Sequence, residues 1–307
     1  MILNGVEVEE TFAEAFPMYG TRILITAINE KWALTAGRTA TGFASSIIMS
    51  PAEAGVERLV PASETPDGRP GCLIHIYHRT PPELKAQVIF RIGQCVLTCA
   101  TTAVFDGIPQ SKRRLSIGSA LGKFGDGFEV KETIYGKPMW RIPVMEGEFL
   151  LEHTIGFVKG VAGGNLLILS EDIKSGLTAT EKAVEAIEKN VRDVCLPFPG
   201  GIVRSGSKVG SLKYPKLTAT TNHLFCPKLR DKVQGSLVPA GVNNVYEIVI
   251  NGLNVEAVKK AMGVAIKAAV TVSGVRKITA ANYGGKLGPY KIFTNEAVDS
   301  VKDISIA

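Results

Sequence analysis

The chain has 307 residues, of which 45% are hydrophobic and 21% are charged. This composition is typical of a folded protein and excludes wholesale disorder, while the length exceeds the roughly 100–200 residues of one ordinary domain. The net charge of +6 favours an anionic partner, and polyanionic coenzymes, RNA and simple solubility are all compatible with it.

The N-terminal segment does not have the pattern of a secretion signal. Its first 16 residues include acidic side chains where a signal peptide has a basic start followed by an apolar core. Apolar stretches such as residues 263–272 are interrupted by Lys267 and are shorter than the roughly 20 residues of a membrane span. These features predict a soluble, cytoplasmic protein that does not bind membranes.

The first half of the chain predicts the order strand, helix, strand, strand, helix, strand. Asn29 is a plausible N-cap for the first helix, and Thr80-Pro-Pro-Glu83 is a capping box that starts the second. The predicted elements are strand 22–27, helix 29–41, strand 44–49, strand 72–78, the helix beginning at residue 80, and strand 101–105.

The second half repeats this order. Its predicted elements are strand 166–169, a helix starting at residues 178–181, a strand near Val194, strand 246–250, helix 254–271 and strand 277–280. Each half folds most simply as an antiparallel sheet with two helices on one face, the split βαβ or ferredoxin-like arrangement. We therefore predict an α+β protein with two such lobes, residues 1–150 and 151–307, joined by a glycine-rich hinge or close backbone contact near residues 145–164.

The sequence has few of the usual catalytic motifs. It contains no H-E-x-x-H, G-x-S-x-G, Walker or dinucleotide-binding pattern in a suitable context. Its five cysteines form no C-x-x-C pair, and Cys95 and Cys99 share a predicted helix face without a histidine, so core packing is favoured over metal binding. His75 and His78, three apart on a strand, point to opposite faces. We therefore predict no metal site.

Several loops combine Gly and Pro with charged residues. In the segment at residues 63–71 (SETPDGRPG), a turn with an Asp67–Arg69 pair is as plausible as a binding role. Residues 204–208 (RSGSK) and 284–288 (GGKLG) could offer backbone N–H groups and a lysine to an anion, although plain turns are the commoner explanation.

Glu247 is a charged residue in an otherwise apolar predicted strand, YEIVI. If its side chain faces a closed cleft, burial would raise its pKa and leave an acid able to donate a proton near neutral pH. From the pattern alone, an alternating strand with Glu247 on its solvated face is the favoured alternative.

Seven segments, in order, resemble the formylmethanofuran:tetrahydromethanopterin formyltransferase family. They are EAFPM (14–18), TGF-x-x-S-x-IM-x-PAEAG (41–55), SETPDGRPG (63–71), GQCVLT-x-x-TTAVF-x-G (93–107), PFPGGIV-x-SGSK (197–208), YEIVINGL (246–253) and NYGGKLG (282–288). The match extends from Asn4 to about Tyr290, and this many ordered segments are far more specific than a single motif.

The resemblance implies two ferredoxin-like lobes, a homotetramer, and methanofuran and tetrahydromethanopterin as substrates with no permanently bound cofactor. It implies that a pterin nitrogen attacks the formyl carbon to give a tetrahedral intermediate, and that Glu247 is the general acid. It also implies substrate contacts in the matching segments, for which the candidates are Ser63, Glu64, Asp67, Arg69, Ser205, Ser207, Lys208, Tyr246, Tyr283 and Lys286.

Some positions depart from the family pattern. Ser50 stands where many relatives have cysteine, Arg204 where a small residue is frequent, and residues 118–129 follow the family loosely. The basic charge differs from the acidic archaeal members and suggests a bacterial type, in which the formyltransferase can be a subunit of a formyltransferase/hydrolase complex. An accessory or scaffolding subunit is therefore the alternative function, whereas RNA binding lacks the expected RNP1 pattern.

Overall fold

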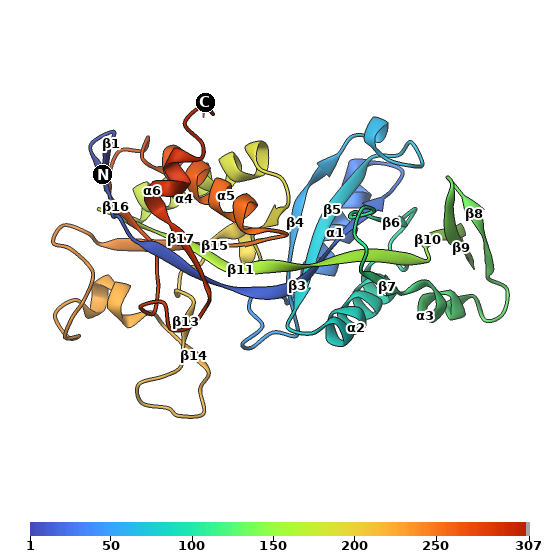
Figure 1. Cartoon of the computed structure of the whole chain (residues 1–307), viewed down its shortest axis with the longest axis horizontal. Coiled ribbons are helices and arrows are strands. Elements are labelled where there is room, and N and C mark those ends of the chain that lie inside the picture. Colours follow the sequence, from blue (N-terminus) through green and yellow to red (C-terminus); the bar gives the residue numbers. More distant parts are fainter. Residues whose placement is uncertain (305–307) are drawn as a thin grey trace. The chain divides into compact units, whose positions relative to one another are not determined.

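Figure 1 shows a computed structural model of the chain, of which residues 1–304 are described here. The chain groups into two compact units. The first-half unit is Met18–Gly160, and the second-half unit consists of Met1–Pro17 together with the chain from Val161 onward. The first 17 residues thus pack with the second half, a feature that a single division at residue 150 does not describe. The domain boundary at residue 150 itself stays a prediction.

The first-half unit contains four antiparallel strands in the order β4-β5-β3-β6, and β10, parallel to β6, continues the sheet to β9 and β8. Its main elements are β3 (Phe12–Thr26), α1 (Glu30–Thr41), β4 (Glu53–Val60), β5 (Gly71–His78), α2 (Pro81–Arg91) and β6 (Ala103–Asp106). The remaining elements are β7 (Arg114–Ser116), α3 (Gly118–Gly122), β8 (Val130–Ile134), β9 (Lys137–Val144) and β10 (Gly147–Glu152).

The second-half unit repeats this topology with the sheet order β12-β15-β11-β16. Its main elements are β11 (Thr154–Ser170), α4 (Ile173–Asn190), β12 (Val194–Cys195), β15 (Asn244–Gly252), α5 (Val255–Ala269) and β16 (Val275–Thr279). The others are β1 (Ile2–Leu3), β2 (Val6–Val8), β13 (Lys208–Val209), β14 (Ala219–Thr220), β17 (Tyr290–Phe293) and α6 (Thr294–Asp299). Both units are ferredoxin-like, and the predicted α+β fold class is confirmed.

The sheet of the second-half unit separates two apolar layers. Alternate residues of β11 point to opposite faces, so Ile168 packs with the helix residues while Leu167 packs with Val238 and Val242. Figure 1 shows α4, α5 and α6 on one side of the strands and the β13–β14 segment on the other. The face away from the helices is therefore covered by the long connection between β12 and β15.

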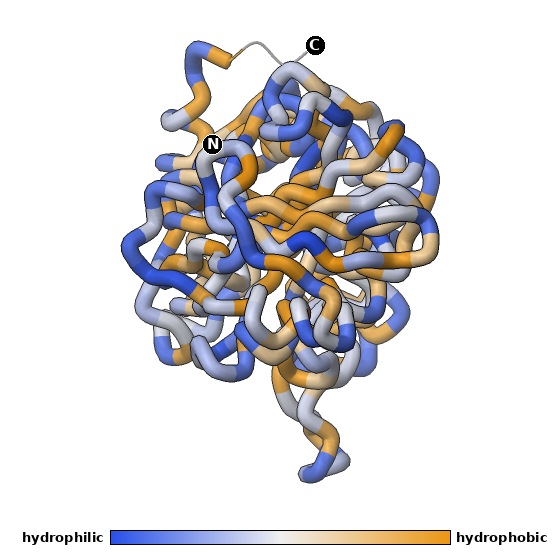
Figure 2. Tube along the Cα trace, turned by 90° about the vertical axis from the view of Figure 1, so that its right-hand side faces the viewer, coloured by the Kyte–Doolittle hydropathy of each residue, from blue (hydrophilic) through white to orange (hydrophobic). Residues whose placement is uncertain are grey.

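The hydropathy of the chain follows this layering. In Figure 2 the hydrophobic segments, drawn in orange, lie mainly inside, and the hydrophilic ones, in blue, lie mainly on the outside. In the first-half unit the core on the helix side joins Ile23, Ile25 and Ile74 with Ala36 of α1 and Val88 of α2. None of the helices formed by residues 1–304 is long and apolar enough to cross a membrane.

The local helix signals are confirmed at three helices. The Asn29 side chain accepts a hydrogen bond from Trp32 N–H at 3.1 Å, and the Asn254 side chain accepts one from Ala257 N–H at 2.8 Å. Thr80 forms the predicted capping contacts with Glu83. Side-chain caps satisfy N–H groups that have no partner inside the helix, so these three starts could be placed from sequence alone.

Two predicted elements are wrong in position. Residues 44–49 form turns instead of a strand, because Ser50 donates its hydroxyl to the Ser46 carbonyl at 2.6 Å and closes the segment locally; the strand follows as β4. The fourth helix begins at Ile173, not near residue 178, because the side chain of Asp172 accepts the Ser175 N–H at 2.9 Å and caps the helix earlier.

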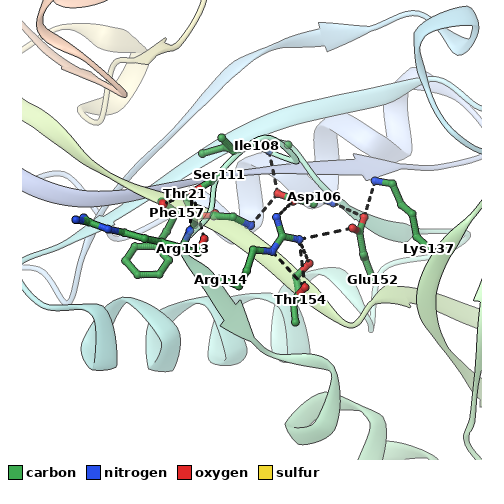
Figure 3. Close-up of polar contacts among 12 residues, drawn as sticks. Thr21, Asp106, Ile108, Ser111, Arg113, Arg114, Lys137, Glu152, Thr154 and Phe157 are labelled. Carbon is green, nitrogen blue, oxygen red and sulfur yellow. Dashed lines mark hydrogen bonds and ion pairs between the residues drawn. The ribbon is translucent and has the colours of Figure 1, made fainter.

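A buried charge network fixes the strands around β6 in the first-half unit (Figure 3). Asp106 accepts hydrogen bonds from the N–H groups of Ile108 and Gly156, each at 2.9 Å, and its other oxygen lies 2.5 Å from an Arg114 nitrogen. Glu152 accepts from the Asp106 N–H and from Lys137 Nζ, both at 2.9 Å. Each buried carboxylate thus has cationic and N–H partners from several strands.

We expect Asp106→Asn to destabilise the protein by about 2–3 kcal/mol, because an amide nitrogen cannot accept the Arg114 hydrogen bond. The free energy of unfolding in urea measures this loss. Asp126→Asn, an exposed change in the same unit, is the matched control and is expected to change stability little. Equal stability of the two variants would contradict the assigned role of Asp106.

Candidate functional site

Glu247 lies on β15 with its side chain on the face away from the helices. Its residue pairs with Leu167 on one side, and on the other its N–H and carbonyl bond to Val203 at 3.0 and 2.7 Å. The residue is 1% exposed, so the alternative that placed Glu247 on a solvated face is wrong. The alternating pattern failed because the β12–β15 connection covers this second face of the sheet.

The carboxyl group of Glu247 has one polar partner residue. Ser207 donates its N–H to Oε2 at 2.7 Å, and the Ser207 hydroxyl lies 2.5 Å from Oε1. Within residues 1–304 no ion pair involves this carboxyl. Burial raises its pKa to about 7, because the two hydrogen bonds from Ser207 only partly offset the loss of water around the charge. Near neutral pH the group can therefore both hold and release a proton.

The carboxyl group of Glu247 lines a small cavity in the second-half unit, and a larger cavity neighbours that one. The small one of about 70 Å³ is lined by Glu247 and Ser205, and the larger one of about 430 Å³ is lined by Lys208 and Tyr283. Asn222 and Phe225 line both cavities, so the two are neighbours across these side chains. The space large enough for part of a coenzyme is therefore the larger cavity, which is separated from the Glu247 cavity by these shared side chains.

The larger cavity contains one cation without an internal carboxylate partner. Lys277 bonds to Glu7 and Glu9 at 3.1 and 3.0 Å and is therefore neutralised. Lys208 contacts neutral oxygens, the Thr220 hydroxyl at 2.7 Å and the Gly210 carbonyl at 3.3 Å, and pairs with no carboxylate of residues 1–304. Lys208 is thus able to meet an anionic ligand in this cavity.

The loop at residues 282–288 is a nest, but it holds a carboxylate of the chain itself. Glu14 accepts backbone hydrogen bonds from Tyr283 at 2.7 Å, Gly285 at 3.0 Å and Gly288 at 2.7 Å, and a further short one from Leu287. Burial opposes the Glu14 charge, but these four donors outweigh it and hold its pKa below the usual range. The expectation that this nest meets an external anion is therefore not supported.

The other candidates of the second-half unit differ in their surroundings. Lys286 is exposed, and Ser205 is exposed at the edge of the small cavity. The Tyr283 hydroxyl accepts a hydrogen bond from Val209 N–H at 3.1 Å. Tyr246 precedes Glu247 on the strand, so its side chain points to the opposite, helix-covered face and is not brought to the carboxyl group.

The candidates in residues 63–69 belong to the first-half unit. Asp67 and Arg69 form the predicted pair, with Arg69 Nε 2.9 Å from the Asp67 carboxylate, and Arg69 also donates to the Thr101 carbonyl at 2.5 Å. Glu64 pairs with Arg58 at 2.9 Å, and Ser63 is exposed. The turn explanation of this segment is confirmed, while substrate contacts by these residues stay a prediction.

Sequence reasoning assigned no role to Asn222, Phe225, His223 or Glu14. The first three line the larger cavity but lie at a short 3-10 turn, His223–Phe225, and its N-cap, which carry no periodic signal. Glu14 could have been singled out, because it is a charged residue flanked by apolar ones within β3. A buried position for such a residue implies dedicated hydrogen-bond donors.

The thiols and histidines show no metal-binding arrangement within residues 1–304. The five cysteines are free, and burial raises the pKa of Cys72 to about 12. His75 is fully buried and bonds to Glu57 at 2.6 Å and to Tyr77 at 2.8 Å, so both ring nitrogens have protein partners.

The fold and the site define a class of protein with two ferredoxin-like lobes. One lobe holds a buried carboxyl that can be protonated near neutral pH, in a small cavity next to a larger one lined by Lys208. Comparison with known proteins specifies the family. Residues 1–144 match the family model described as formylmethanofuran-tetrahydromethanopterin formyltransferase, and residues 147–297 match its companion, the proximal lobe. The chain belongs to the formylmethanofuran–tetrahydromethanopterin formyltransferase family.

Individual relatives support this assignment over nearly the whole chain. The formyltransferases of Methanosarcina barkeri and Methanocaldococcus jannaschii are 52% and 53% identical, over 96% of this chain and 99% of theirs. The solved M. barkeri structure gives a TM-score of 0.94 at 52% identity, covering 97% of this chain and 100% of that one. A chain of the formyltransferase/hydrolase complex from Methylorubrum extorquens, solved with methylofuran, gives 0.92 at 43% identity, covering 97% and 98%.

The raised pKa of Glu247 predicts a pH-dependent contribution to stability. Because the folded-state pKa of about 7 exceeds the ordinary 4.5, the contribution is full below pH 4.5 and is lost as pH rises through 7. Between pH 4.5 and 8, the free energy of unfolding of the parent protein is expected to fall by on the order of 3 kcal/mol more than that of Glu247→Gln. Urea unfolding at both pH values measures this, with the exposed Glu256→Gln as the control. Equal pH dependence in parent and variant would contradict the assignment.

Proposed function

We propose that this protein transfers a formyl group reversibly between formylmethanofuran and tetrahydromethanopterin through a ternary complex. The family membership and the names of the relatives support both substrates. The observation that carries the proposal is the buried carboxyl of Glu247, with a pKa near neutrality, which lines a small cavity next to the larger one. A transfer between two amines requires placement, charge stabilisation and a proton donor, each of which such a site can supply.

The proposed reaction begins with attack of a pterin ring nitrogen on the formyl carbon. The new C–N bond forms as the carbonyl electron pair moves to oxygen, giving a tetrahedral oxyanion. This collapses with cleavage of the old C–N bond, while Glu247 gives its proton to the departing aminomethylfuran nitrogen. The attacking nitrogen loses its own proton, which restores the Glu247 acid for the next turnover.

We assign the support of the oxyanion to Tyr283 in preference to Tyr246. The Tyr283 hydroxyl accepts from Val209 N–H, so its own hydrogen is free to donate into the cavity that this residue lines. Tyr246 lies on the opposite face of β15 from Glu247. Hydrogen-bond donors fixed before the reaction are the most effective stabilisers of a developing negative charge.

We further propose that Lys208 binds an anionic group of the coenzyme in the larger cavity, since among residues 1–304 it is the lysine lining that cavity without a carboxylate partner. Contacts by Ser63, Glu64, Asp67, Arg69, Ser205 and Lys286 remain predictions from the family resemblance. The proposed chemistry uses acid and hydrogen-bonding groups of the chain and requires no permanently bound cofactor. A homotetramer in the cytoplasm, or assembly in a complex like that of the M. extorquens relative, also remains a proposal.

We expect Glu247→Gln to lower kcat for formyl transfer by roughly 10²–10⁴-fold, because the amide keeps the size but cannot donate the proton. The parent rate is expected to fall above pH 7, where the acid ionises. Steady-state kinetics of the purified chain alone measure both effects, with Glu256→Gln as the control. Full activity of a folded Glu247→Gln would exclude the acid role, and turnover of the parent without partners would exclude an accessory function.

We expect Lys208→Met to raise KM for one coenzyme by roughly 10-fold or more while changing kcat less, because a charge-assisted contact to the substrate is lost. Lys213→Met is the matched control, since this exposed lysine of the neighbouring segment lines neither cavity. Varying each coenzyme separately identifies which one is affected. Unchanged KM values for both would contradict an anion contact at Lys208.

A further inference from the structure

We propose that Glu14 is a positioning residue of the formyl-transfer site, acting through the loop at residues 282–288 and the hydroxyl of Tyr283. This inference rests on the proposed function and deepens it. Glu14 is a buried carboxylate, 4% exposed, that the acid chemistry at Glu247 does not use. All four of its side-chain hydrogen bonds are accepted from a single loop, so Glu14 determines the conformation of that loop.

The loop is shaped around both oxygens of the Glu14 carboxylate. Oε2 accepts from Tyr283 and Gly285, and Oε1 accepts from Leu287 and Gly288. Gly284 and Gly285 have φ values of 68° and 76°, a left-handed conformation in which glycine is favoured. Convergent N–H groups of this kind require an anion. If glutamine replaced Glu14, the amide NH₂ of its side chain would face the N–H donors of the loop and could not accept hydrogen bonds from them.

The loop also lies close against strand β3, which carries Glu14. A Cβ at Gly288 would lie 2.3 Å from the Ala15 carbonyl oxygen, so only glycine fits between the loop and the strand. The neighbouring β17 pairs with β3 and places Lys291 opposite Glu14 in register. At the start of the loop, the Asn282 side chain donates to the Phe12 carbonyl at 3.1 Å, so β3 contacts the loop at both of its ends.

One hydrogen bond connects the loop to the segment that carries the site residues. Val209 N–H donates to the Tyr283 hydroxyl at 3.1 Å, and Val209 follows Lys208, which lines the larger cavity with Tyr283. Ser207, one residue earlier, bonds to both carboxyl oxygens of Glu247. Glu14 thus fixes one wall of the cavity and, through Val209, the segment that carries Lys208 and Ser207.

A double-mutant cycle of Glu14→Gln and Tyr283→Phe tests this inference. The readout is the equilibrium binding of formylmethanofuran and of tetrahydromethanopterin, each measured alone, because binding needs no proton transfer. We expect each single change to weaken binding of one coenzyme by about tenfold, with the other coenzyme affected less than about twofold. Because both act through one contact, the double variant is expected to stay near tenfold, well short of the roughly hundredfold of independent effects.

Exposed Glu10→Gln, on the same N-terminal segment, is the matched control and is expected to bind both coenzymes normally. If Glu14→Gln fails to fold, Gly284→Ala replaces it, because this position has open space for a methyl group but strains the left-handed backbone of the nest. The same selective loss of binding is expected, again without further loss when combined with Tyr283→Phe.

Two results would overturn the inference. A lower melting temperature with unchanged binding of both coenzymes would reduce Glu14 to a structural residue, and a hundredfold loss in the double variant would show that it does not act through Tyr283. The failure of the proposed function is distinguishable from either, since full activity of Glu247→Gln would remove the acid role and leave these binding constants unaffected.

Discussion

The site depends on the desolvation of a single carboxyl group without a cationic partner. A surface glutamate keeps its charge at neutral pH, and a glutamate paired with lysine or arginine keeps it even at lower pH. Glu247 is almost fully buried and has no ion-pair partner within residues 1–304, and the two hydrogen bonds from Ser207 do not make up for the loss of hydration. Burial without a counter-charge therefore turns an ordinary side chain into a group that can hold or release a proton near pH 7.

The ferredoxin-like topology of the second-half unit makes this burial possible. Its helices occupy one face of the sheet, and in many such sheets the other face is open to solvent. Here the long connection between β12 and β15 covers the second face, with Val238 and Val242 packing on Leu167 and Leu169. The same connection supplies Ser207 and Lys208, so one segment both excludes water from Glu247 and provides its polar surroundings.

Local signals could be read from the sequence wherever neighbouring residues decide the structure. Asn29 and Thr80 cap their helices as expected, and Asn254 caps the helix that was expected to start there, because a cap is formed by residues within one turn of each other. The failures have the same origin: Ser46 and Ser50 close a turn where an apolar run suggested a strand, and Asp172 caps a helix ahead of the threonine that was expected to start it. In both cases a short polar side chain overrode the pattern around it.

By itself, the sequence determined the repeated strand and helix order, the α+β class, the family resemblance and the identity of Glu247 as the residue of interest. It could not determine whether Glu247 is buried, because a strand pattern does not say what covers its second face. Nor could it say what the glycine nest at residues 282–288 holds, since Glu14 lies more than 260 residues away in the chain. Tertiary structure decided both, because desolvation and hydrogen-bond pairing depend on which distant segments meet in space and not on their order along the chain.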